Sequence, residues 1–346
     1  MPQEVTDLNN TTAYLINMTT LRRNISFATS VSITYLATAP LLYITFIASI
    51  IANGFYLWVL RFKMKKTINT LLFFHLILSY LISSLIIPFK ITSFLQSDHW
   101  SFGIAMCKVF NSTFSLGMFA SVFILSAISL DRYILTLHPV WSQKHRNIHW
   151  ASSILTGIWI FATIFSIPYL IFREIHKESN GIVTCKNNYA LSNNWKSQKT
   201  QTLGKGVQMV LFISRLWLGF LLPLFIIIFC YVKVAQRMRQ RRLVKSSKPF
   251  KVMVISVGSF FVCWMPYHVY QGLLISESHM QVTKLTLILT AITSSFNSFF
   301  SPTFYLFIGE NFKKVFKKSI VVLFDSILHE ESSLKQPQNP CTEVSV

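Results

Sequence analysis

Residues 104–137 read IAMCKVFNSTFSLGMFASVFILSAISLDRYILTL, a long apolar run that closes on the charged triplet Asp131-Arg132-Tyr133. About 20 consecutive apolar residues suffice for a helix to cross the hydrocarbon core of a bilayer, so this run predicts a membrane-spanning helix. The triplet then lies at one end of the span, where an ion pair could hold the helix end. Arginine carries five N–H donors, which lets it exchange partners there.

Six further apolar runs are each long enough to span a bilayer. They cover residues 33–60, 67–92, 150–172, 207–236, 250–275 and 283–308. Prolines within several runs are compatible with spanning helices, because neighbouring helices can satisfy the freed carbonyl groups. The sequence therefore predicts an all-α membrane protein, a seven-helix transmembrane bundle over residues 33–308, with its two termini on opposite sides of the membrane.

The composition also favours a membrane protein. Hydrophobic residues make up 52% of the chain and charged residues only 13%, whereas an average soluble domain has about 25% charged residues. The net charge is +20, and the basic residues concentrate in the connections that follow spans 1, 3, 5 and 7. Lysine and arginine favour cytosolic connections, so the C-terminus is predicted in the cytosol. Attraction to anionic lipid then explains the charge, and no nucleic-acid partner is expected.

Residues 1–32 form a polar tail with acceptor sequences for N-glycosylation at Asn9, Asn10, Asn17 and Asn24. Such sequences favour a translocated segment, which agrees with an extracellular N-terminus and a multi-pass protein of the plasma membrane. Cys107 and Cys185 fall on the same outer side. Because that compartment is oxidising, we expect a disulfide that ties the loop before span 5 onto the top of span 3.

A set of short motifs accompanies the seven predicted spans. It comprises Asn53, Asp131-Arg132-Tyr133, Trp159, Pro223, Tyr231, Cys263-Trp264-Met265-Pro266 and Ser301-Pro302-Thr303-Phe304-Tyr305. With these motifs in these places, residues 33–323 resemble a rhodopsin-like, or class A, G-protein-coupled receptor.

Three connecting segments narrow the resemblance to the chemoattractant branch, which includes the formyl-peptide, chemerin and anaphylatoxin receptors. They read WSFG over 100–103, LHPVWSQKHR over 137–146 and GENFKKVF over 309–316. The resemblance implies an extracellular ligand, a heterotrimeric G protein of the inhibitory class, and arrestin and receptor kinases as partners.

The resemblance also implies roles for single residues. Arg132 would pair with Asp131 at rest and turn toward the G protein in the active state, where Tyr231 and Tyr305 would hold it. Trp264, above the kink expected at Pro266, would sense the ligand. The segment 309–324 is amphipathic and predicts a helix on the inner membrane surface. The tail 325–346 would be cytosolic and carry phosphorylation sites for arrestin binding.

A ligand pocket is expected on the outer side, among spans 2, 3, 5, 6 and 7. Its candidate residues are Lys90, Lys108, Asn111, Ser115, Met118, Arg215, Tyr267, His268, Gln271 and Lys284. A charge inside a span is costly, so Arg215 should face the bundle and mark function. We hypothesise that Arg215 binds a carboxylate of a peptide or lipid acid. The alternative is that Arg215 pairs with Glu174 or Glu178 of the outer loop.

Other classes of function fit less well. The chain has no metalloprotease, hydrolase or phosphate-loop motif, and its histidines form no metal-ligand pattern, so neither an enzyme nor a metal or other cofactor is expected. A transporter would need a polar pathway and usually a repeat, and neither is evident. A ligand-binding decoy, or an arrestin-biased receptor with weak G-protein signalling, stays open because two positions depart from the family pattern.

Those two positions are Tyr80, where most of the family has an Asp in span 2, and Ser301, where Asn or Asp usually precedes the proline of span 7. In the family these groups help to hold a sodium ion. The polar groups remaining here are Asn53, Tyr80, Ser121, Asn297 and Ser301, all neutral at pH 7 because the tyrosine pKa is about 10.

We therefore predict that sodium does not modulate ligand affinity. Without a carboxylate, the polar groups offer no negative charge to a bound cation. The check is a ligand-binding titration against sodium chloride, with choline chloride at equal ionic strength as control. Sodium-dependent affinity that disappears in Tyr80→Phe would contradict the prediction.

Overall fold

The computed structural model describes residues 33–178, 181–189, 197–240, 247–276 and 280–306, together with residues 315 and 318. The four glycosylation sequences and the tail 325–346 lie outside this part, as does nearly all of the predicted amphipathic helix 309–324. Side chains of 301–306 also lie outside it, so Ser301, Pro302 and Tyr305 are placed on a helix but not described further.

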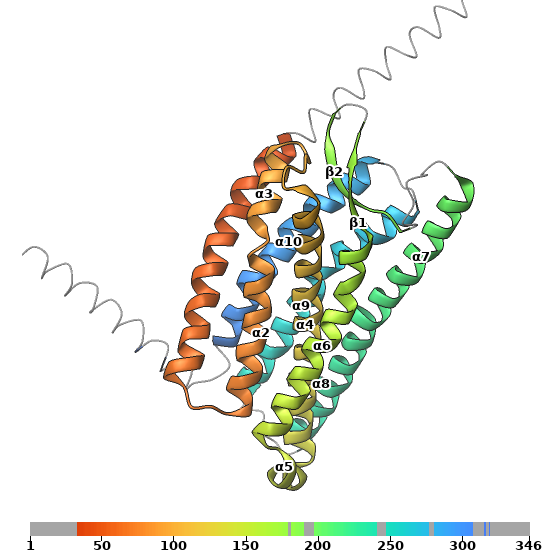
Figure 1. Cartoon of the computed structure of the whole chain (residues 1–346). Helices are drawn as coiled ribbons and strands as arrows, with labels where there is room; N and C mark the ends of the chain where they lie inside the picture. Colours follow the sequence, from red (N-terminus) through yellow and green to blue (C-terminus); the bar gives the residue numbers. More distant parts are fainter. Residues whose placement is uncertain are drawn as a thin grey trace, which may run out of the picture.

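Seven long helical segments run through the described residues (Figure 1). The first is Ile33–Lys63, which ends in the π-helical turn η1 (Val59–Lys63). The others are α2 (Ile68–Ser84) with α3 (Ile87–Leu95), α4 (Gly103–Leu137), α6 (Ile148–Phe172), α7 (Gln198–Leu216) with η2 (Trp217–Leu221) and α8 (Leu222–Gln240), α9 (Ser247–Ile275), and α10 (Met280–Leu306). A short helix, α5 (Pro139–His145), follows α4. Each predicted span corresponds to one of the seven segments as far as the described residues go, since residues 307–308 of the last predicted span lie outside them.

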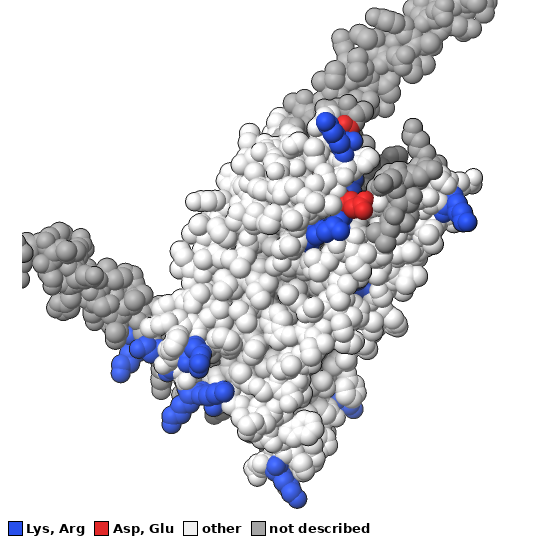
Figure 2. Space-filling view, viewed as in Figure 1, with Lys and Arg blue, Asp and Glu red and all other residues white. Residues whose placement is uncertain are grey.

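Within the described residues, five segments are long and apolar enough to cross a membrane, from Ile33–Lys63 to Gln198–Gln240. The helices α9 and α10 have 29 and 27 residues, which exceeds the length that a bilayer core requires. Figure 2 shows a middle band of the molecule that is almost without charged residues, with Lys and Arg gathered toward both ends. This distribution fits a bundle embedded in lipid.

The helix α4 lies at the centre of the bundle. It contacts α2, α6 and α8 and also strand β1. Phe119, Val122, Ile124 and Leu125 of α4 are fully buried in the main apolar cluster. By contrast, large apolar side chains on the outer helices, among them Phe161 and Val262, are exposed. In a bilayer, these outer faces meet hydrocarbon at no cost, so the burial pattern is that of a membrane bundle.

An antiparallel hairpin covers one end of the bundle, which we call the hairpin end. It consists of β1 (Arg173–Lys177) and β2 (Val183–Asn187), with Ile175 opposite Cys185. Cys185 forms a disulfide with Cys107 near the start of α4, with Cα atoms 5.8 Å apart. The expected disulfide is therefore confirmed, whereas the hairpin itself was not foreseen from the sequence.

The helix that carries Arg215 is interrupted by the π-helical turn η2 just before Pro223. Gly219 of this turn is buried against Phe119 of α4, and a Cβ added there would lie 2.4 Å from the Phe119 Cε1 atom. The Phe119 ring is fully buried and cannot move aside freely. Only glycine therefore allows the two helices to approach this closely.

We predict that Gly219→Ala destabilises the bundle by about 1–3 kcal/mol, the usual effect of overpacking a core. A thermal unfolding scan of the purified protein should show a lower midpoint, partly restored by the added change Phe119→Leu. Gly258→Ala is the matched control, because a Cβ at Gly258 meets nothing within 4 Å. Equal midpoints for the Gly219 and Gly258 variants would contradict the packing argument.

Candidate functional site

A cavity of about 210 Å³ lies at the hairpin end, between the helices and beneath β2. Residues of α2, α3, α4, α6, α9 and α10 line it, together with the hairpin. Of the predicted ligand residues, four line this cavity: Lys90, Asn111, Tyr267 and Gln271. Trp264, the predicted ligand sensor, also lines it and is 3% exposed.

The other predicted ligand residues do not line this cavity. Lys108 points toward α6, where its Nζ donates to the Ile171 carbonyl at 3.5 Å. Ser115 and Met118 are both 1% exposed and belong to the packed interior. His268 packs with its ring centroid 4.6 Å from that of Phe220. Lys284 is also absent from the cavity lining. Helical spacing placed these residues on the right helices but did not give the depth or direction of their side chains.

Arg215 faces the bundle, as its charge predicted, but it lies outside the cavity lining. It is 4% exposed, and its guanidinium carbon lies 4.4 Å from the centroid of the Tyr169 ring. The Tyr169 and Tyr267 hydroxyls hydrogen-bond to each other, and both residues line the cavity. Tyr189 interacts electrostatically with Arg215. Three tyrosines thus surround the guanidinium.

Neither loop glutamate pairs with Arg215 in the described part of the chain. The Glu174 carboxylate accepts from Asn188 Nδ2 at 2.7 Å. Glu178 forms an ion pair with Lys186 at 2.7 Å, and this hydrogen-bonded partner lowers the pKa of the Glu178 carboxyl. The structure therefore contradicts the alternative in which Glu174 or Glu178 neutralises Arg215.

Asp98 is a cavity residue that the sequence analysis missed. It lies in the turn between α3 and α4, six residues beyond the predicted end of span 2, and was not counted among the outer acids. The signal available in the sequence was its place two residues before Trp100, within the segment that leads to Cys107.

Trp264 links the cavity to the rest of the bundle. Its ring contacts those of Phe114 and Phe260, at centroid distances of 5.2 and 6.0 Å. All of these belong to, or pack against, the apolar cluster that also contains Ile128 and Tyr231 near the opposite end of α4. A displacement at the cavity floor can therefore be carried through contiguous packing.

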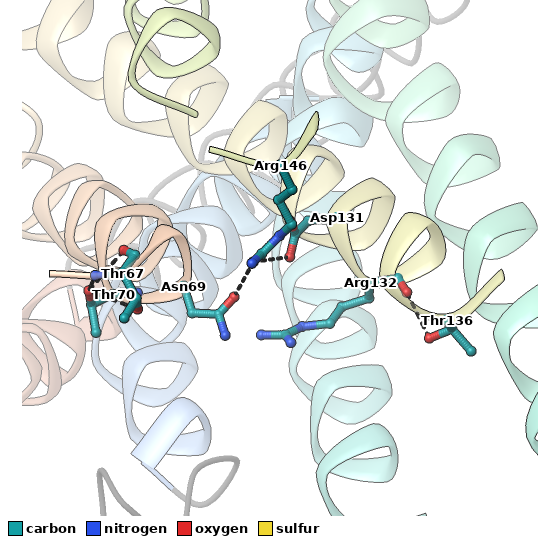
Figure 3. A network of polar contacts seen from close by, with 7 residues as sticks. All are labelled: Thr67, Asn69, Thr70, Asp131, Arg132, Thr136 and Arg146. Atoms are coloured by element: carbon teal, nitrogen blue, oxygen red, sulfur yellow. Dashed lines mark hydrogen bonds and ion pairs between the residues drawn. The ribbon is translucent and has the colours of Figure 1, made fainter. Parts of the chain in front are cut away.

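At that opposite end, which we call the Arg132 end, Asp131 is paired with Arg146 instead of Arg132 (Figure 3). Arg146 Nε and Nη2 donate to the two carboxylate oxygens at 2.7 and 3.1 Å, and Nη2 also donates to Asn69 Oδ1 at 2.9 Å. The expected Asp131–Arg132 pair is thus not the one in this structure. The guanidinium fork of Arg146 binds both carboxylate oxygens at once.

The Arg132 guanidinium does not pair with Asp131 at this end. Its Nε has no hydrogen-bond partner among the described residues, and Figure 3 shows its guanidinium apart from the Asp131 carboxylate. Tyr231 is 8% exposed and interacts electrostatically with Arg132. Tyr133 contacts the ring of Phe229 on α8 at a centroid distance of 5.9 Å.

Of the five neutral polar residues where the family holds sodium, Asn53 takes part in an uncharged hydrogen-bond network. Asn53 Nδ2 donates to Ser49 Oγ at 2.9 Å and to the Ser298 carbonyl at 3.0 Å, and Ser49 bonds Ser84 at 2.7 Å. Tyr80 is 1% exposed and belongs to the main apolar cluster. Ser121 bonds back to the Met118 carbonyl. Asn297 is buried on α10.

Comparisons with known proteins agree with this arrangement. The family model described as 7 transmembrane receptor (rhodopsin family) matches residues 52–305. The chain is 61% identical over 333 residues to Probable G-protein coupled receptor 33 of Pan troglodytes, covering 96% of this chain and 99% of the relative. It is 38% identical over 291 residues to Chemerin-like receptor 1 of Sus scrofa, covering 82% and 79%.

A further relative, the C3a anaphylatoxin chemotactic receptor of Oncorhynchus mykiss, is 37% identical over 294 residues, covering 84% of this chain and 78% of the relative. The resemblance to the chemoattractant branch is thereby confirmed, and an enzymatic function is excluded by the family. With its helical bundle, its disulfide and the Asp131-Arg132-Tyr133 end all in place, the chain belongs to the rhodopsin family of seven-transmembrane receptors.

Proposed function

We propose that this receptor binds an anionic extracellular ligand, a peptide or an acidic lipid, in the cavity at the hairpin end and activates an inhibitory-class G protein at the Arg132 end. The hairpin end would face outward with the glycosylated tail, and the Arg132 end would face the cytosol with the basic connections. The chemerin and C3a receptors among its relatives support the chemoattractant assignment. Arrestin and receptor kinases would act on the tail.

The observation that carries this proposal is that Asp131 pairs with Arg146 and not with the adjacent Arg132. Because Arg146 occupies both oxygens of Asp131, Arg132 is not held by its neighbour. A guanidinium without that partner can reach a G protein. The cavity and this end are connected through one apolar cluster, so ligand binding and G-protein binding can favour the same arrangement of helices.

Charge in the cavity supports an anionic ligand. Lys90, Arg173 and Lys186 line it, against Asp98 as the acid among the lining residues. Arg215 lies directly behind the Tyr169–Tyr267 pair. In the proposal, a ligand carboxylate reaches Arg215 when these two tyrosines separate, and a buried guanidinium then gains a bidentate partner. Asn111 and Gln271 would contribute neutral hydrogen bonds.

We predict that Arg146→Gln lowers G-protein activation about fivefold or more, the effect of roughly 1 kcal/mol. Without Arg146, the half-buried Asp131 carboxylate takes Arg132 as its partner and withdraws it. The added change Asp131→Asn should restore activity, and Arg132→Ala should abolish it. The measurement is inhibition of cyclic AMP in cells that express each variant, with and without pertussis toxin.

Lys144→Gln is the matched control for this series, because Lys144 is an exposed cation of α5, two residues before Arg146, and forms no ion pair in the described residues. The ligand panel should hold peptides and acidic lipids and include a ligand-free condition. A response that toxin does not reduce would refute the inhibitory class. Surface-expressed receptor that binds ligand but stays silent would support a decoy instead.

We further predict that Arg215→Ala weakens an acidic agonist from this panel at least about tenfold, whereas Arg215→Lys weakens it less. The measurement is the concentration of half-maximal response, compared for the agonist and its uncharged amide. The amide should lose little in the variant, because it makes no charge-assisted bond. Lys199→Ala, an exposed cation on the same helix, serves as control. Equal potency of the acidic agonist on wild type and Arg215→Ala would show that Arg215 does not bind the ligand carboxylate.

A further inference from the structure

Asp98 is the acid among the residues that line the cavity, in a protein whose net charge is +20. Neither the charge balance nor the proposed binding of an anionic ligand accounts for it. A carboxylate beside a site for anions would weaken their binding by like-charge repulsion. A separate role is therefore needed to explain why Asp98 lines the cavity.

The turn that carries Asp98 is held in place on both sides. Ser97 and Asp98 have φ values of 55° and 70°, in the left-handed region that costs free energy for residues other than glycine. The Asp98 amide donates to the Ser93 carbonyl at 2.8 Å, and the Trp100 amide donates to the Val183 carbonyl of β2 at 2.7 Å. The strained backbone is thus fixed between α3 and the hairpin, which is a common feature of ligand sites.

The Asp98 carboxylate is far from satisfied by the protein. Its one hydrogen bond is from Ser93 Oγ, at a long 3.4 Å, and it forms no ion pair within the described residues. A carboxylate offers about four acceptor positions. Most of this hydrogen-bonding capacity is therefore not used by the described residues.

The three cations that line the cavity are directed elsewhere. Lys186 pairs with Glu178, and Arg173 Nη1 donates to the Cys185 carbonyl at 2.9 Å. Lys90 Nζ lies 4.5 Å from the centroid of the Phe94 ring, close enough to Asp98 for an electrostatic interaction but not for an ion pair. Opposite charges thus line one cavity without neutralising each other by contact.

Two tyrosines, Tyr35 and Tyr270, lie within electrostatic range of the Asp98 carboxylate. Tyr35 stacks on Phe94 with ring centroids 4.7 Å apart, and its hydroxyl, on a residue 2% exposed, has no hydrogen-bond partner among the described residues. A cavity lined by a carboxylate together with the rings of Trp100 and Tyr270 is a good environment for an ammonium or guanidinium group, which gains both an ion pair and cation–π contacts.

We propose that Asp98 forms a second subsite of the cavity that binds an ammonium or guanidinium group of the ligand. Lys90 and Arg173 form no ion pair within the described residues and can bind an anionic group of the same molecule, so the ligand carries both charges. This inference rests on the proposed ligand-binding function and narrows it: a purely anionic lipid leaves Asp98 facing a like charge. Whether the cation is an amino terminus or a basic side chain is decided by the test.

The test uses four pools of synthetic random octapeptides, prepared with a free or an acetylated amino terminus and with or without Lys and Arg. Each pool is incubated with the full-length receptor in lipid nanodiscs, and retained peptides are measured by mass spectrometry. The variants are Asp98→Asn, which is tolerated in the left-handed region, and Asp98→Glu, which keeps the charge. Glu174→Gln is the control for loss of an outer acid away from the cavity.

Wild type should retain peptides that carry a cation about tenfold more strongly than Asp98→Asn does. Asp98→Glu should recover part of this difference, and Glu174→Gln should match wild type. Retention of free-terminus peptides without Lys or Arg identifies an amino terminus, and retention of acetylated peptides with Lys or Arg identifies a side chain. Thermal unfolding of each variant checks that only folded receptors are compared.

Three results would overturn the subsite: equal retention of all four pools by wild type, an unchanged preference in Asp98→Asn, or no peptide retained above empty nanodiscs. Oleate, an acidic lipid, is tested for binding in the same nanodiscs. If oleate binds while the peptide pools give the first or third result, the proposed binding of an anionic ligand stands and only the cation subsite is refuted. Since the readout is binding, a failure of G-protein coupling in cells does not affect it.

Discussion

A lipid bilayer offers a polypeptide no hydrogen-bond partners in its hydrocarbon core, and every other feature of this receptor follows from that constraint. Backbone amides must bond within their own segment, so each apolar run becomes a helix. Because the helices meet lipid on their outer faces, apolar burial alone does not decide how they pack. Close approach and polar contacts at the interior decide it instead.

Small residues provide that close approach here. Gly117 of α4 lies against Ser79 and Ser83 of α2, and Gly219 lies against Phe119. Interior serines mostly bond carbonyls of their own helices, as Ser79 and Ser83 do, so their hydroxyls enter the bundle without open hydrogen-bonding groups. The result is a central helix, α4, that is packed against three neighbours and carries the disulfide at one end and the Asp131-Arg132-Tyr133 triplet at the other.

The sequence predicted the helices well because length and hydropathy are local properties. It also placed Trp264, Tyr267 and Gln271 together, since residues one turn apart share a helix face. It did not predict that Arg146 would take Asp131, because that contact depends on how a short connecting helix folds back. Nor did it predict Asp98 in the cavity, since the position of a turn relative to a hairpin 80 residues later is a tertiary property.

The π-helical turn at Trp217–Leu221 has a consequence for comparing such chains by position. The turn adds one residue to the helix, so all residues on its amino-terminal side are rotated about the helix axis by about 100° relative to a regular α-helix. Counting back from Pro223 at 3.6 residues per turn therefore places Arg215 about 100° away from the direction that the turn gives it. Equivalent positions above this turn are found by superposition in space, and an alignment that ignores the turn shifts each of them by one residue.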